Sequence, residues 1–319
     1  MKSAMPELKL RTVTRTQGNN KALKDGTVKP RSCELEFVEV EPLIDAFRRM
    51  VRGLEFDVSE MAMTTYITAR AYGKRLTGLP IFLVRAFHHG AIVYNTKSGI
   101  KNPRDLEGRK VGVNRGYTVT TGLWARGVLQ HQYGVDLDTI TWVLSGDEHV
   151  AEYRPPSNVV PIEKGKKMAD LVASGELPAA IGVEVESPDV KPLIANAGDQ
   201  GLEALRSRGH YPINHLMVVK DEVLDAHPVL APDLFNAFAE AKRIYVRRLQ
   251  GGPIENPTRV DDLHRQVMAI TGRDPLPYGI APNRQALEEI IQYALEQRIL
   301  ARPVTVEELF PPSTHGLVG

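Results

Sequence analysis

Cysteine is nearly missing from this chain, and its scarcity removes two classes of protein. Only Cys33 is present among 319 residues. A single cysteine can build neither an intramolecular disulfide framework nor a thiolate metal cluster. Cys33 precedes a strand-like run at 34–37, so we interpret it as a small structural residue.

Long apolar runs and concentrated positive charge are missing too. No window approaches the roughly 20 apolar residues of a membrane span, and residues 1–8 lack the apolar stretch of a signal peptide. We therefore expect a cytoplasmic protein. Lysine and arginine total 40 against 39 acidic residues, without a basic stripe suited to nucleic acid or an anionic membrane. Small molecules are the expected partners, and self-association into a homo-oligomer is left open.

Internal repeats are also absent, which argues against a solenoid. Short apolar runs alternate instead with helical periodicity. Strands alternating with helices predict a mostly parallel sheet covered by helices on both faces. Strands are expected at 35–40, 56–58, 81–84, 91–94, 110–113, 141–144, 159–162, 179–183 and 211–219. Helices are expected at 43–51, 64–72, 119–132, 167–174, 233–249, 260–270 and 283–297.

The length of the chain favours two lobes, because a single hydrophobic core has stopped growing at this size. The strand expected at 211–219 returns to the first lobe, so the middle of the chain is inserted into a lobe made of both ends. We predict a first lobe of residues 1–95 and 217–319 and a second lobe of 109–212. Residues 96–108 and 213–216 are the expected crossings. Insertion is tolerated because the termini of a domain lie close together on its surface.

Several motifs resemble known proteins. Residues 97–113 (KSGIKNPRDLEGRKVGV) resemble the crossing into the second lobe of type II solute-binding proteins. A narrower resemblance, to 4,5-dihydroxyphthalate decarboxylase, covers nearly the whole chain. It is carried by FDVSEM at 56–61, RAFHH at 85–89, WARG at 124–127 and PYGI at 277–280. This resemblance implies a two-lobed α/β fold like that of type II periplasmic binding proteins, with the ligand cleft between the lobes.

The same resemblance implies an activity. The expected enzyme removes one carboxylate from a hydroxylated aromatic (di)carboxylate such as 4,5-dihydroxyphthalate, without a cofactor or a metal. Direct loss of carbon dioxide would leave a strongly basic aryl carbanion, so the carboxyl-bearing carbon must be protonated first with help from a ring hydroxyl. Histidine suits the general acid because its ordinary pKa is near 6.5. Arginine suits a retained carboxylate because its fork donates two parallel hydrogen bonds.

Three residues form the expected catalytic set. His89, just before the strand expected at 91–94, is the first choice as general acid, and a histidine hydrogen-bonded at a strand edge is the structural alternative. His215 is the second choice, because it lies on the return crossing while His89 lies close to the first one. The alternative is that both histidines are structural and only tie down adjacent strands. Arg85 is expected to hold a carboxylate, although an ordinary ion pair would also explain it.

Polar side chains at strand ends form the expected substrate-binding set. The loop at 114–120 opens a helix whose free amide donors and dipole favour an anion, outside the carboxyl end of a strand. A plain threonine N-cap is the alternative there. The loop at 17–20 (QGNN) is uncharged where the family has a charge pair, which permits a less acidic ligand. The expected contacts are Asn19, Glu60, Thr64, Thr65, Arg115, Tyr117, Thr118, Thr120 and Glu184.

The sequence lacks the motifs of several other classes of enzyme. It contains no helical His-x-x-x-His pair or Cys/His zinc pattern, no glycine-rich phosphate loop and no nucleophile elbow. The main competing hypothesis is a solute-binding protein of an ABC-type uptake system for a small carboxylate or aromatic ligand. An intracellular ligand sensor or a precursor-synthesis enzyme of related fold is a third.

Overall fold

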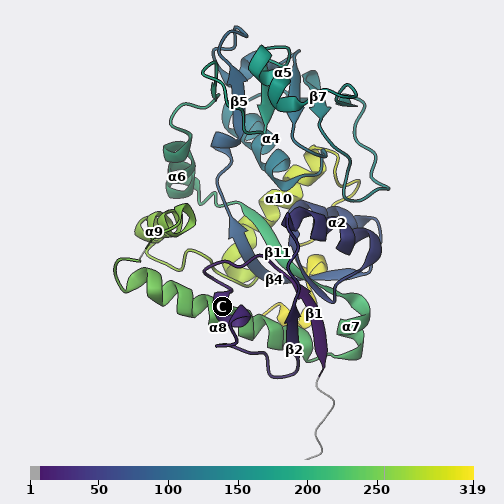
Figure 1. The fold of residues 1–319 in the computed structure, drawn as a ribbon, viewed down its shortest axis with the longest axis vertical. Helices are drawn as coiled ribbons and strands as arrows, with labels where there is room; N and C mark the ends of the chain where they lie inside the picture. Colours follow the sequence, from purple (N-terminus) through teal and green to yellow (C-terminus); the bar gives the residue numbers. More distant parts are fainter. Residues whose placement is uncertain (1–7, 255) are drawn as a thin grey trace, which may run out of the picture. The chain divides into compact units, whose positions relative to one another are not determined.

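The computed structural model describes residues 8–254 and 256–319, which divide into two compact units. The first unit contains Met1–Arg85, Ile213–Glu288 and Val304–Gly319, and the second contains Ala86–Pro212 and Glu289–Pro303. Each unit has its own sheet. In Figure 1, β1, β2, β4 and β11 label the first sheet, and β5 and β7 label the second.

The sheet of the first unit has the order β2-β1-β3-β11-β4. β1 pairs in parallel with β2 and β3, whereas β11 is antiparallel to both β3 and β4. The expectation of a mostly parallel sheet is therefore wrong, because the returning strand is inserted in the opposite direction. The strands are β1 (Lys9–Val13), β2 (Glu34–Phe37), β3 (Val58–Ala62), β4 (Leu76–Arg85) and β11 (Ile213–Lys220).

The sheet of the second unit has the order β10-β5-β9-β6-β7-β8. β6, β7, β8 and β9 form a parallel group, while β5 is antiparallel to both β9 and β10. This sheet too is mixed. The strands are β5 (Ile92–Asn95), β6 (Lys110–Val113), β7 (Thr141–Leu144), β8 (Val159–Pro161), β9 (Ala179–Ile181) and β10 (Val190–Pro192).

Helices form where apolar residues recur at helical spacing. In α2, the buried residues Leu43, Phe47, Met50 and Val51 lie on one face, which packs against β3. α4 ends at Gly134, whose φ of 66° suits a left-handed helix end. The helices are α1 (Lys21–Lys24), α2 (Leu43–Gly53), α3 (Met63–Ala71), α4 (Thr120–Tyr133), α5 (Met168–Ser174), α6 (Ala197–Arg208), α7 (Asp221–Ala226), α8 (Leu230–Gln250), α9 (Arg259–Thr271) and α10 (Arg284–Glu296). None of these helices is both long and apolar enough to cross a membrane.

The division between the units corrects the predicted lobe boundaries. Residues 86–95 were assigned to the first lobe, but β5 pairs with β9 and β10 and so belongs to the second sheet. Residues 213–216 are not a crossing, because they begin β11 of the first sheet. Residues 289–303 belong to the second unit, where Gln297 accepts a hydrogen bond from Arg126 at 2.8 Å. These assignments depend on pairing between distant segments, which local patterns do not encode.

Candidate functional site

Glu60 is the central group of the candidate site, which lies in the first unit. It sits on β3 and is completely buried. One carboxylate oxygen, Oε2, accepts hydrogen bonds from Thr14 Oγ1 at 2.6 Å and from the Arg15 amide at 3.2 Å. The other, Oε1, lies 2.7 Å from His215 Nδ1. A buried carboxylate is costly unless it is paired and hydrogen-bonded, and these contacts satisfy that need.

Two neighbouring strands position the Glu60–His215 pair. In the antiparallel β3–β11 pairing, His215 is opposite Ala62, and Met217 is opposite Glu60. Residues two apart on a strand face the same side, so Glu60 and Ala62 share a face of the sheet. His215 is therefore the diagonal neighbour of Glu60, within reach of a side-chain contact.

The pKa of Glu60 reflects a balance of burial and partners. Burial acts most strongly and would raise the pKa of this carboxyl. The hydrogen bond and charge of His215, the hydrogen bond from Thr14 and the charge of Arg15 together outweigh burial, so the pKa lies below its ordinary value. Glu60 is therefore a carboxylate at neutral pH and a fixed acceptor for the imidazole.

His215 has the geometry of a proton donor. Its Nδ1 is engaged by Glu60, and its ring meets the edge of Phe47 at a centroid distance of 5.2 Å. These two contacts orient the ring. Nε2 has no hydrogen-bond partner among the described residues, and 21% of the side chain is exposed. A histidine held at one nitrogen by a carboxylate presents the other nitrogen for proton transfer.

The loop after β1 supplies neutral donors around the pair. Gln17 Nε2 lies 3.4 Å from Glu60 Oε2, and its backbone amide donates to Asn20 Oδ1 at 2.8 Å. Asn20 Nδ2 in turn donates to Thr14 Oγ1 at 3.0 Å. Thr14 is not among the residues that the sequence predicted for the site, and Gln17 was expected only as part of the uncharged loop at 17–20. The signal that points to them is a glutamate in a fully buried strand, which needs donors from the loop after the neighbouring strand.

The other predicted residues of the first unit are also buried. Asn19 donates to the Leu83 carbonyl at 2.9 Å. Arg85, at the end of β4, donates through Nη1 to Asn283 Oδ1 at 2.7 Å. Thr64 and Thr65 lie in the first turn of α3 and are almost fully buried. The N-cap residue of α3 is Ala62, so neither threonine is the cap.

His89, the first choice as general acid, is buried in the second unit. It begins the short 3₁₀ helix at His89–Ala91, and its Nε2 lies 2.7 Å from Gln132 Oε1. Burial is the main cause that lowers its pKa, and repulsion from His210 and Arg208 acts in the same direction, while the Gln132 contact opposes them. The ring is fully enclosed. The structure thus places His89 in a packed polar cluster, where the neutral imidazole is favoured, and its role as an acid stays a prediction.

The anion site expected at the start of α4 is occupied by a carboxylate of the chain itself. Glu148 accepts hydrogen bonds from the amides of Tyr117 and Thr118 and from Thr118 Oγ1, the last at 2.6 Å. This corrects the prediction of an open anion site at this loop. Arg115 is exposed there, with a φ of 70°, and its amide donates to Ser145. The remaining predicted contacts of this unit are Thr120, which is buried, and Glu184, which is exposed.

Replacing Glu148 by alanine should turn this internal contact into a true anion site. The variant leaves three buried donors without their acceptor, so we expect it to be less stable by roughly 1–3 kcal/mol. Added sulfate should restore stability by filling the vacated position. Thermal unfolding over a sulfate series measures both effects, with Glu186→Ala, which removes an exposed carboxylate, as the matched control. Equal sulfate dependence in the two variants would contradict this assignment.

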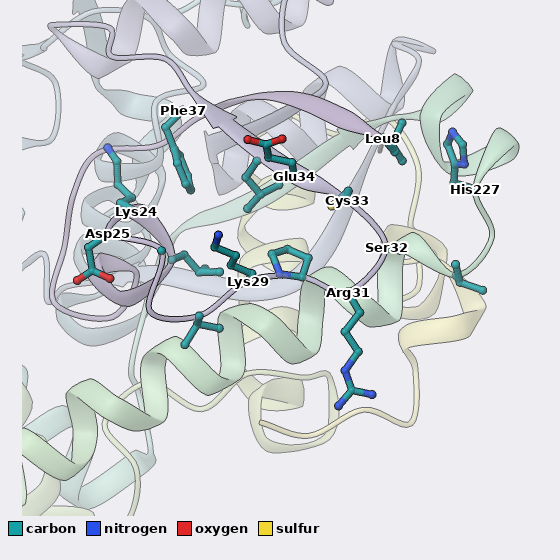
Figure 2. A pocket seen from close by; sticks show the side chains of 16 residues that line it. Leu8, Lys24, Asp25, Lys29, Arg31, Ser32, Cys33, Glu34, Phe37 and His227 are labelled. Atoms are coloured by element: carbon teal, nitrogen blue, oxygen red, sulfur yellow. The ribbon is translucent and has the colours of Figure 1, made fainter. Parts of the chain in front are cut away.

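A hollow elsewhere in the first unit is not lined by the Glu60–His215 pair. It encloses about 820 Å³ beside β2, and in Figure 2 Lys24 and Asp25 lie at one end and His227 at the other, while Arg31 points away. Burial raises the pKa of the Cys33 thiol in its wall to about 12, which disfavours a nucleophilic thiolate. Across the described residues, no group of three histidine, cysteine, aspartate or glutamate side chains is arranged to hold a metal ion.

Comparison with solved structures defines the class of protein: the chain has the fold of type II periplasmic binding proteins. The periplasmic aliphatic sulphonate binding protein SsuA from Escherichia coli matches 98% of this chain and 100% of its own with a TM-score of 0.54 at 12% identity. The desulfurization enzyme DSZB matches 96% of this chain and 97% of its own, with a TM-score of 0.52 at 15% identity. The family model described as NMT1/THI5 like matches residues 56–154.

Comparison with characterised sequences is more specific. Over 97% of its length, the chain is 27% identical to 4,5-dihydroxyphthalate decarboxylase of Comamonas testosteroni, of which it covers 98%. It is 29% identical to 4,5-dihydroxyphthalate decarboxylase of Pseudomonas putida over 52% of this chain and 66% of that protein. The resemblance seen in the sequence motifs is confirmed at full length.

Proposed function

We propose that this chain is a cofactor-independent decarboxylase acting on a hydroxylated aromatic carboxylate such as 4,5-dihydroxyphthalate. The observation that carries the proposal is the Glu60–His215 pair, whose 2.7 Å contact leaves Nε2 of the imidazole available. The full-length similarity to a decarboxylase supports it. A pair that only held a ligand would not need a titratable nitrogen.

The proposed step moves one proton and breaks one carbon–carbon bond. His215, as the imidazolium, donates the Nε2 proton to the ring carbon that bears the carboxylate, with electron density supplied by a ring hydroxyl. The carbon–carboxylate bond then breaks, its electron pair restores the aromatic ring, and carbon dioxide leaves. The neutral imidazole regains a proton from water. The balance is one proton consumed for each carbon dioxide released.

Glu60 acts in this scheme as a positioning residue. Its oxygens accept hydrogen bonds from Thr14 and Arg15 and contact His215, so in this proposal it acts on the imidazole rather than on the substrate. It holds Nδ1 and so fixes which nitrogen carries the mobile proton. Arg85 and the α3 threonines Thr64 and Thr65 remain the proposed contacts for the substrate carboxylates and hydroxyls.

The competing proposal is capture of a small carboxylate or aromatic ligand without turnover. The fold favours it as a second candidate, because SsuA, which shares the architecture, is a binding protein by name. Electrostatic capture of a carboxylate does not require His215 to change protonation state. The two functions therefore differ in whether carbon dioxide is released.

Carbon dioxide release from a panel of hydroxylated aromatic acids tests the proposal. We expect release from an acid that has a hydroxyl ortho or para to the departing carboxylate, because that hydroxyl stabilises the protonated ring. The analogue without hydroxyls should bind and release nothing. Calorimetry on the same panel measures affinity separately. Tight binding of the panel without release from any member would favour the solute-binding function.

A further inference from the structure

A second hollow in the first unit lies between residues 15–21 and helices α8 and α9. It encloses about 470 Å³, which is within the range of small-molecule sites. Arg15 and Gln17 contribute to its lining, but Glu60 and His215 do not.

One wall of this hollow is a hydrogen-bonded chain of three side chains. The Tyr245 hydroxyl donates to Asp261 Oδ1 at 2.6 Å. Since a hydroxyl has one proton, its 2.9 Å contact with His264 Nδ1 must use a proton on that nitrogen. Burial lowers the pKa of His264 to about 4, against the opposing charges of Asp261 and Asp274. The neutral imidazole therefore carries its proton on Nδ1, and Nε2 is a bare acceptor.

A second acceptor in the lining also has no donor. Asn19 is 2% exposed, and its Nδ2 donates to the Leu83 carbonyl, so the orientation of the amide is fixed. Its Oδ1 has no hydrogen-bond partner among the described residues. A buried acceptor without a donor is uncommon in a finished core. Asn19 Oδ1 and His264 Nε2 are therefore two acceptors that a bound molecule could satisfy by donating hydrogen bonds.

The rim of the hollow is positively charged. Arg15, Lys21 and Arg248 are exposed in the lining, and none of them forms an ion pair with a described carboxylate. Asp261 is the acidic side chain of the described lining, and it is engaged by Tyr245 and Thr258. Three unpaired cations around a hollow attract an anion.

We infer that this hollow binds a small anion that carries hydroxyl groups. The anionic group lies at the rim with Arg248 and Lys21, and the hydroxyls donate to His264 Nε2 and Asn19 Oδ1. Leu83 and Tyr245 supply apolar wall against the carbon skeleton. Both aromatic and aliphatic hydroxy acids have this chemistry. The inference does not depend on the proposed decarboxylation.

Three carboxylates test the inference on the full chain: 3,4-dihydroxybenzoate, gluconate and benzoate. The readout is the NMR signal of the His264 imidazole, assigned by its loss in His264→Asn. At least one of the two hydroxylated probes should shift this signal at saturation, and benzoate should bind at least about tenfold more weakly. A shift by 3,4-dihydroxybenzoate alone indicates that the apolar wall selects a ring, and a shift by gluconate shows that aliphatic acids suffice. Failure of both hydroxylated probes to shift the signal, or equal affinity for benzoate, would overturn the inference.

Matched variants test separately the positive charge of Arg248 at the rim and the acceptor nitrogen of His264. Arg248→Ala should weaken binding by roughly tenfold, whereas Arg247→Ala, at the preceding position on α8 and outside the lining, should not. His264→Asn keeps a hydrogen-bond partner for Tyr245 but removes Nε2. Calorimetry should therefore show weaker binding of the hydroxylated probes and unchanged binding of benzoate. His215→Asn should leave this binding unchanged, which separates failure here from failure of the decarboxylase proposal. Equal affinities of the two arginine variants would refute the assigned rim.

Discussion

Replacing His215 by asparagine should lower carbon dioxide release by roughly 10²–10⁴-fold, the usual range for loss of a general acid. An asparagine amide can still donate to Glu60 Oε1, so the site keeps its hydrogen bond and most of its shape while it loses the mobile proton. Substrate affinity should change much less than turnover. Single-turnover carbon dioxide release and calorimetric affinity, measured on the same preparation, distinguish the two.

Two further histidine variants serve as a control and as a test of the competing assignment. His227→Asn alters a histidine at the end of α7 and should leave turnover unchanged. His89→Asn tests the other candidate for the general acid, which is buried and hydrogen-bonded to Gln132. If His215→Asn keeps full turnover and His89→Asn loses it, the proton comes from His89. If both keep full turnover, the acid assignment is wrong.

Glu60→Gln tests the positioning role by separating turnover from binding. Glutamine can still contact Nδ1 of His215, but it removes the negative charge that faces the imidazole. We expect carbon dioxide release to slow while the binding constant stays close to that of the wild type, because Glu60 acts through the proton donor and not on the substrate. Equal losses of turnover and of affinity would contradict a positioning role.

The stability of the protein should fall by about 3 kcal/mol as the pH is lowered from 6.5 to 4, because of His264. The pKa of His264 in the folded state is about 4, mainly because burial penalises the charged ring, whereas its ordinary value is 6.5. A histidine with a depressed pKa stabilises the fold above its unfolded pKa and loses that contribution as the pH falls toward the folded pKa. Asp261, Asp274 and Arg85 are the charged groups that act on it.

Urea unfolding at a series of pH values measures this loss. His264→Asn cannot titrate, so its free energy of unfolding should change much less between pH 6.5 and 4. Glu60 acts in a lower window: its pKa is depressed below the ordinary 4.5, so its contribution is present above that pH and disappears below it. A wild-type stability that stays flat down to pH 4.5 would contradict the burial of His264.

Local patterns predict most of the secondary structure of this chain. The strands expected at 110–113 and 141–144 match β6 and β7, and the helix expected at 119–132 lies within one residue of α4. These elements are found because period-two and helical apolar patterns, together with the glycine at 134, act within one element. α6 was missed because few of its residues are buried, chiefly Gly201, Ala204 and Leu205, which is too few for a clear periodicity.

Contacts between distant residues could not be predicted in the same way. Glu60 and His215 are 155 positions apart, and they meet because β11 is inserted beside β3. The donors at the start of α4 suggested an external anion, but Glu148 supplies the charge from a loop about 30 residues away. The sequence by itself determined which side chains could donate, accept or titrate. Only the tertiary structure decided which of them are satisfied by one another, because burial and pairing depend on chain segments that local pattern does not connect.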